Sequence, residues 1–319
     1  MKKMLLTAGA GAALLSSGFV LAGDAKMYGR AHVSYQYESY KYGGDQDGST
    51  FILKSNASRV GIRGKKSLDN DLIAIYQLEW EVDFADKDSD GDNILKARNT
   101  FIGIASEFGT VIAGTYDTPL KKSQGKVDIF GDLNADIKHV VQGENRLNNL
   151  LQYSSPKIMD AFTVNVAMVP GEDREDGVNE ADNDIGNYIS TSLIYKSDNF
   201  YGAFALDDSV KGLNTIRLTG VVKVQDARIG LLYQTSELSD GGDSEDGIIV
   251  SASYKLGKET LKFQYGVSDM KVAGLSQVSL GIDHKLAKKT KLFAFLTNTS
   301  ADVESAEELV IGSGIQHKF

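Results

Sequence analysis

The 319-residue chain contains no cysteine, only three prolines and a single tryptophan. Without cysteine it forms no disulfide and cannot carry a lipid on an N-terminal cysteine. No run of about 18 consecutive apolar residues follows the first 22 positions, which excludes transmembrane helices. Acidic residues number 43 against 34 basic ones, a net charge of −9, and this balance argues against a nucleic-acid partner.

The first residues have the pattern of an export signal. Lys2 and Lys3 precede an apolar stretch, Leu5 to Leu21, and the small residue Ala22 suits signal peptidase. A membrane anchor is the alternative, but the stretch is short for a span and is diluted by glycine and serine. The sequence therefore predicts a signal peptide at residues 1–22 and one mature domain at residues 23–319.

The mature chain is dominated by segments in which apolar and polar residues alternate. The clearest runs from Leu72 to Phe84, with leucine, tyrosine, tryptophan and phenylalanine on one face and glutamine and acids on the other. Alternation of this kind indicates β-strands. We count about sixteen such segments, of lengths close to the 9–11 residues that cross a bilayer obliquely.

The connections between these segments alternate between short and long. Short ones include Ser197–Asn199 and Gly257–Lys258, whereas long charged ones include Pro170–Gly186 and Asp207–Asn214. A soluble β-sandwich has no reason to sort its loops in this way, but a membrane barrel has short periplasmic turns and long external loops. The sequence therefore predicts an all-β, transmembrane antiparallel barrel with a water-filled lumen.

One long connection, residues 118–146, interrupts the alternation in the middle of the chain. A loop of this length within a compact domain is usually functional or disordered. It falls between the fifth and sixth predicted strands, on the side of the long loops. We expect it to fold into the lumen.

Several stretches resemble the trimeric general porins of Gram-negative bacteria. They are SNASRVGIRGKKSLDNDLIAIYQLEW (Ser55 to Trp80), ARNTFIGIASEFGTVIAG (Ala97 to Gly114), RLNNLLQYSSPKIMDAFTV (Arg146 to Val164) and the terminal IGSGIQHKF with its last aromatic residue. The resemblance covers the whole mature chain. It implies a homotrimer of barrels in the bacterial outer membrane, surrounded by lipid and lipopolysaccharide, with the third external loop folded inward as a constriction.

The residues predicted to line that constriction carry opposite charges. Alternation places the arginines on the lumen face, and the resemblance assigns basic wall positions to most of them. The candidates on the wall are Arg30, Arg59, Arg63, Arg98 and Arg146. Those on or beside the loop are Asp117, Asp128, Asp132, Asp136 and Glu144, with Asp128 and Asp132 as the preferred pair. Opposed charges across a narrow neck orient polar solutes and slow apolar ones.

The function that follows is passive diffusion of small hydrophilic solutes and ions. The acidic net charge, together with Thr115 where members of the resembled family often carry arginine, leads us to expect a mild preference for cations. A substrate-selective channel for phosphate, sugar or peptide is the main alternative, although no aromatic slide or dense Arg/Lys ladder is apparent.

Two weaker readings concern other chemistry. Asp86–Gly91 begins like a calcium-binding loop, but Ala97 stands at the twelfth position, where glutamate is required. An outer-membrane hydrolase is the alternative of a different class, since four histidines are present, yet none lies in a catalytic motif. We expect no enzyme activity, no cofactor and no metal centre.

Overall fold

The computed structural model describes residues 25–42, 47–85, 95–170, 188–302 and 306–319. The predicted signal peptide and the Asp86–Gly91 segment lie outside these residues. Within them, no helix combines the length and the apolar character needed to cross a membrane.

The described residues form eighteen strand segments, one short α-helix and one 3-10 helix. The strands are β1 (Lys26–Lys41), β2 (Gly48–Ser55), β3 (Arg59–Ser67), β4 (Ile73–Val82), β5 (Leu95–Ala97), β6 (Thr100–Ser106), β7 (Gly109–Asp117), β8 (Arg146–Ser154), β9 (Phe162–Val169), β10 (Tyr188–Lys196), β11 (Phe200–Val210), β12 (Leu213–Val224), β13 (Ala227–Leu238), β14 (Glu245–Leu256), β15 (Glu259–Ser268), β16 (Leu275–Ala287), β17 (Thr290–Ser300) and β18 (Glu307–Lys318). The helices are α1 (Pro119–Ser123) and η2 (Ile137–His139).

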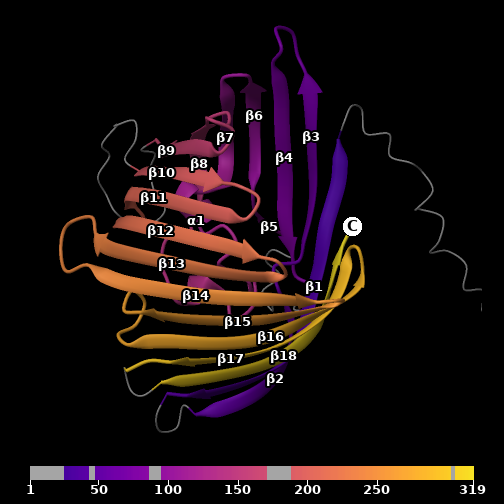
Figure 1. The fold of residues 1–319 in the computed structure, drawn as a ribbon, viewed down its shortest axis with the longest axis vertical. Helices are drawn as coiled ribbons and strands as arrows, with labels where there is room; N and C mark the ends of the chain where they lie inside the picture. The colour runs from indigo at the N-terminus through magenta and orange to yellow at the C-terminus, as the bar shows by residue number, and fades with distance from the viewer. Residues whose placement is uncertain (1–24, 43–46, 86–94, 171–187, 303–305) are drawn as a thin grey trace, which may run out of the picture.

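The eighteen segments occupy sixteen positions in a closed antiparallel barrel. β2 and β3 share one position, because β1 pairs with β2 through one half of its length and with β3 through the other. They are separated at Ala57, whose φ of 48° interrupts the extended backbone. β5 and β6 likewise share a position beside β4. Pairing of β1 with β18 closes the sheet. No edge strand is then left with unpaired backbone N–H and C=O groups, which lipid could not hydrogen-bond. Figure 1 shows the ring of strands.

The two faces of the wall differ as the alternation predicts. Outward-facing residues such as Ile102, Phe51 and Leu231 are exposed, as an apolar belt in contact with lipid must be. Inward-facing positions of the same strands hold Gln234, Gln264 and many serines and threonines, which the inward-folded loop covers. The wall is therefore apolar outside and polar inside.

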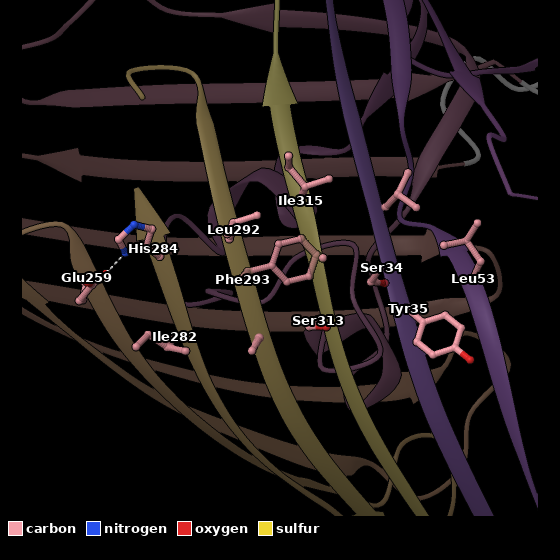
Figure 2. A pocket seen from close by; sticks show the side chains of 13 residues that line it. Ser34, Tyr35, Leu53, Glu259, Ile282, His284, Leu292, Phe293, Ser313 and Ile315 are labelled. Carbon is pink, nitrogen blue, oxygen red and sulfur yellow. Dashed lines mark hydrogen bonds and ion pairs between the residues drawn. The ribbon is translucent and has the colours of Figure 1, made fainter. Parts of the chain in front are cut away.

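The outer wall has a shallow groove of about 710 Å³ across β1, β2 and β15 to β18. Figure 2 shows its lining, where the small Ser313 lies among larger side chains such as Tyr35, Ile282 and Leu292. A Glu259–His284 contact of 2.7 Å lies at one end. Because these side chains point outward, the groove is separate from the channel.

One predicted loop was wrong. Asp207–Asn214 does not form a long connection, because β11 continues to Val210 and β12 begins at Leu213. The turn between them is Lys211–Gly212, with φ angles of 53° and 74°. Two consecutive positive φ values are typical of a tight hairpin turn that matches the twist of the strands. The polar residues belong to strand extensions, whose backbone groups pair whatever their side chains are.

The long stretch after β7 folds inward, as predicted. It contains α1, which Figure 1 shows inside the ring of strands. Thr118 caps α1 by accepting the backbone N–H of Lys121 at 3.2 Å. η2 is capped in the same way by Asp136. These two capped turns give the loop a defined shape.

Candidate functional site

The inward loop packs against the lumen face of the wall through apolar side chains. Val127, Val140 and Val141 contact Leu232, Ile249 and other buried residues of β12 to β16. Further along the loop, a second cluster joins Phe130 and Leu133 to aromatic residues of β17. A small dry core therefore fixes the loop against one side of an otherwise polar lumen.

Glycines on the wall make room for this contact. A Cβ atom added at Gly247 would lie 2.8 Å from Val141 Cγ1, and one at Gly281 would lie 2.6 Å from Phe130 Cε1. Real Cβ contacts are longer than this, so side chains at these positions would push the loop away from the wall. The inward-facing glycines of β13 to β16 are thus part of the docking surface.

A buried arginine that the sequence analysis did not identify clamps the loop at both of its ends. Arg217 on β12 is fully buried, and its Nη1 donates to Glu144 Oε1 at 2.7 Å. It also donates to the carbonyl oxygens of Leu120 and Gln142 at 3.1 and 3.0 Å, and to Gln234 Oε1 at 2.7 Å. Glu144 is therefore an anchoring residue in this structure, held away from the open lumen.

The tip of the loop reaches the opposite wall at Asp132. Its carboxylate pairs with Arg30 on β1 and with Arg59 Nη2 on β3, the latter at 3.0 Å. Asp136 supports the tip by accepting the Asp132 backbone N–H at 2.7 Å. Burial alone would raise the pKa of the Asp132 carboxyl, but the two arginines outweigh it and hold that pKa below its usual value.

A second charged group continues along the wall from Arg59. Glu79 accepts from Arg98 Nε at 3.0 Å and lies 3.7 Å from Arg59 Nη1. Arg98 also donates to Glu81 Oε2 at 2.6 Å. The two glutamates, which face the lumen on β4, were not among the predicted site residues, although the alternation of β4 placed them there.

A third group lies where the loop leaves the barrel wall. Asp117 at the end of β7 forms ion pairs through Oδ1 with Arg146 Nη2 at 3.0 Å and with Lys121 Nζ at 3.2 Å. Asn99 bridges this pair, donating to Asp117 Oδ2 at 3.0 Å and accepting from Arg146 Nε at 2.6 Å. The root of the loop is thereby tied to β8 and to the residue that precedes β6.

Two predicted residues lie apart from these groups. Asp128 lies behind the tip, where it accepts the Phe130 backbone N–H at 3.1 Å. Burial raises the pKa of its carboxyl well above the ordinary value, and the charge of nearby Asp136 adds to this. Arg63 stacks over the Tyr28 ring at 4.8 Å and has no ion pair within the described part of the chain.

The three charged groups around the loop together contain more cations than carboxylates. Asp132, Glu79, Glu81 and Asp117 are shared among five cations, namely Arg30, Arg59, Arg98, Arg146 and Lys121. Each of these acids has at least one charged partner within 4 Å, so none is a free negative charge. The arrangement can orient a polar solute between a basic wall and the loop.

Comparisons with known proteins agree with this architecture. The family model described as Gram-negative porin matches residues 5–303. The chain is 28% identical to outer membrane porin protein 32 of Delftia acidovorans, over 94% of this chain and 91% of that protein. It is similar in fold to an anion-selective porin from Comamonas acidovorans, with a TM-score of 0.74, 21% identity, and coverage of 92% and 99% of the two chains. It is also similar to a trimer form of Vibrio cholerae OmpT, with a TM-score of 0.65, 16% identity, and coverage of 93% and 100%.

Relatives in this family are channels, which leaves the hydrolase reading without support at the family level. The fold, the inward loop and the family match lead to the same conclusion. The chain belongs to the Gram-negative porin family and is an outer-membrane channel protein.

Proposed function

We propose that this porin allows passive diffusion of small hydrophilic solutes, with a mild preference for anions. The observation that carries the proposal is the excess of cations at the constriction, where five basic groups share four carboxylates. A charge acts strongly only within about one Debye length, roughly 8 Å at physiological salt. The narrow region around the loop therefore outweighs charges elsewhere in selecting ions.

This proposal reverses the preference expected from the sequence. The net charge of −9 sums the whole chain and includes acids far from the constriction, such as Asp240 and Asp243 between β13 and β14. Thr115 does leave a basic position vacant, but Arg30, Arg59 and Arg98 remain beside the loop tip. The similarity to the anion-selective porin from Comamonas acidovorans supports the same direction.

Reversal potentials across a potassium chloride gradient in planar bilayers test the proposal. We expect the sign that reports chloride preference, and we expect Arg59→Gln to reduce it. Lys65→Gln, at an exposed position near the end of β3, is the matched control and should leave the potential unchanged. A wild-type potential of the sign for potassium preference would overturn the proposal.

We also propose that the mature protein begins after Ala22 and assembles as a homotrimer in contact with lipid and lipopolysaccharide. The export pattern of the first residues supports the first point, and the similarity to the trimer form of Vibrio cholerae OmpT supports the second. Intact mass of the protein extracted from outer membranes, before and after dissociation, tests both. A retained N-terminus or a monomer would contradict them.

A further inference from the structure

Basic residues stand directly opposite one another on neighbouring strands of this barrel. Five registers place two cations face to face, whereas no register among the described strands places two acids face to face. The basic pairs are Lys26 with Arg63, Arg30 with Arg59, Arg30 with Lys318, Lys285 with Lys291, and Lys223 with Arg228.

Such pairs are unfavourable when nothing lies between them. Like charges directly opposite on adjacent strands destabilise a sheet. For Arg30 and Arg59, the carboxylate of Asp132 relieves the repulsion. No loop acid reaches the Lys285–Lys291 pair in the described structure, and Asp283 on β16 pairs with Lys291 and not with Lys285, which leaves the charge of Lys285 unbalanced.

These lysines form a row that leads to the constriction. Lys285 on β16 opposes Lys291 on β17, and Lys291 opposes Gln316 on β18. Two residues further along the same face of β18, Lys318 opposes Arg30 on β1. Figure 1 shows β16, β17, β18 and β1 side by side. Neighbouring strands are about 4.8 Å apart, so Lys285 lies directly beside Lys291 and Lys318 directly beside Arg30, whereas Lys318 lies diagonally from Lys291.

Only one carboxylate balances the start of this row. Asp283 lies 2.7 Å from Lys291 Nζ and 3.4 Å from Lys262 Nζ, so it is shared between two lysines. Lys285 and Lys318 are exposed and have no ion pair within the described residues. Lys262, Lys285, Lys291 and Lys318 outnumber Asp283 and the terminal carboxylate of Phe319, so a net positive surface faces the lumen at the end of the barrel that carries the chain's C-terminus.

We propose that Lys285, Lys291 and Lys318 form a binding site for small divalent oxyanions such as phosphate, between the constriction and the periplasmic exit. This site builds on the proposed function, because it gives anions that pass the loop a place to bind. A divalent oxyanion suits the row, since oxygens on several sides can engage two cations at once while Asp283 already satisfies part of Lys291. A monovalent ion such as chloride gains much less binding free energy from the same lysines.

Single-channel recording of the purified protein in potassium chloride, with inorganic phosphate added, tests the site. We expect phosphate to reduce chloride current in a saturable way, at a pH at which its divalent form predominates. Lys285→Gln combined with Lys291→Gln should raise the half-blocking phosphate concentration at least about tenfold, because two charges within about 5 Å of the anion are lost. Lys255→Gln combined with Lys258→Gln, at the β14–β15 turn, is the matched control and should not change it.

Two results would overturn the site: unsaturable or absent block in the wild type, or equal block in the double variant. Reversal potentials in potassium chloride, measured on the same channels, separate this proposal from the preceding one. If chloride preference fails while phosphate block still depends on the two lysines, the site stands and the proposed ion preference falls. If chloride preference holds and the lysines have no effect on block, the site alone is refuted.

Discussion

The Arg217 clamp allows the strongest quantitative prediction. Arg217→Met removes an ion pair to Glu144 at 2.7 Å and hydrogen bonds to the carbonyls of Leu120 and Gln142. It leaves Glu144, whose side chain is only 8% exposed, without its cation. Removing one partner of a buried ion pair typically costs about 3–5 kcal/mol.

That loss of free energy should destabilise the docked position of the loop and leave the barrel folded. The backbone of β12 pairs with both neighbouring strands independently of the Arg217 side chain. Since 1.36 kcal/mol corresponds to a factor of ten, a loss of about 3 kcal/mol lowers the ratio of docked to undocked loop by more than about 100-fold. We expect larger, noisier single-channel conductance and tryptic cleavage beside Lys121 and Lys122, with an unchanged melting temperature of the barrel.

A double variant supplies the control for this prediction. Arg217→Met with Glu144→Leu removes both charges, and apolar replacement of a whole buried pair is often neutral or stabilising. The double variant should therefore show less single-channel current noise, and less tryptic cleavage of the loop, than Arg217→Met alone. A single variant that behaves like the wild type, or a double variant no better than the single, would refute the reasoning.

Three further predictions concern the loop and its charges. Asp132→Asn should free the loop tip and increase current noise at pH 7, and acid should do the same to the wild type. Because the folded-state pKa of Asp132 is lowered, its stabilisation is present above the ordinary pKa of about 4 and disappears as pH falls through the lowered value, which recordings between pH 6 and pH 2 can follow. Gly281→Val should force Phe130 off the wall, at a cost of about 1–3 kcal/mol, and increase tryptic cleavage, whereas Gly220→Val, with open space around it, should not. Asp128→Asn should change the reversal potential less than Arg59→Gln does, because Asp128 lies behind the loop tip and its raised pKa favours the neutral carboxyl; an equal or larger shift would contradict its assignment.

Much of the fold could be predicted because each of the sixteen strand positions of the barrel alternates between apolar residues that face lipid and polar residues that face the lumen. Alternation identified the strands, and the gap between Thr118 and Arg146 identified the loop. The same rule failed between Leu206 and Thr215, where polar residues suggested a loop. There the strands extend past the region where lipid imposes the apolar pattern, and the positive φ at Lys211 closes a tight turn.

The candidate site was only partly predictable, because its charges depend on contacts between distant segments. Alternation could place Arg59 and Arg98 on the lumen face. It could not show that Asp132 pairs with Arg30, which lies 102 positions earlier in the chain, and with Arg59, which lies 73 positions earlier. Arg217 was missed because a single arginine in a strand looks like any other lumen residue. Its role appears only when the loop covers it.

The placement of the loop against the β12–β16 wall is the central claim, and the cysteine-free chain permits a direct measurement of it. Val141→Cys removes the Cγ1 methyl that a Cβ atom at Gly247 would meet at 2.8 Å. Val141→Cys with Gly247→Cys should therefore form a disulfide under mild oxidation, because the two positions are close enough for the Cβ separation of about 3.5–4.5 Å that a disulfide requires. The linked protein should retain its conductance, and Val141→Cys with Gly312→Cys, on distant β18, should not link. Failure of the first pair to link, or efficient linking of the second, would contradict the account.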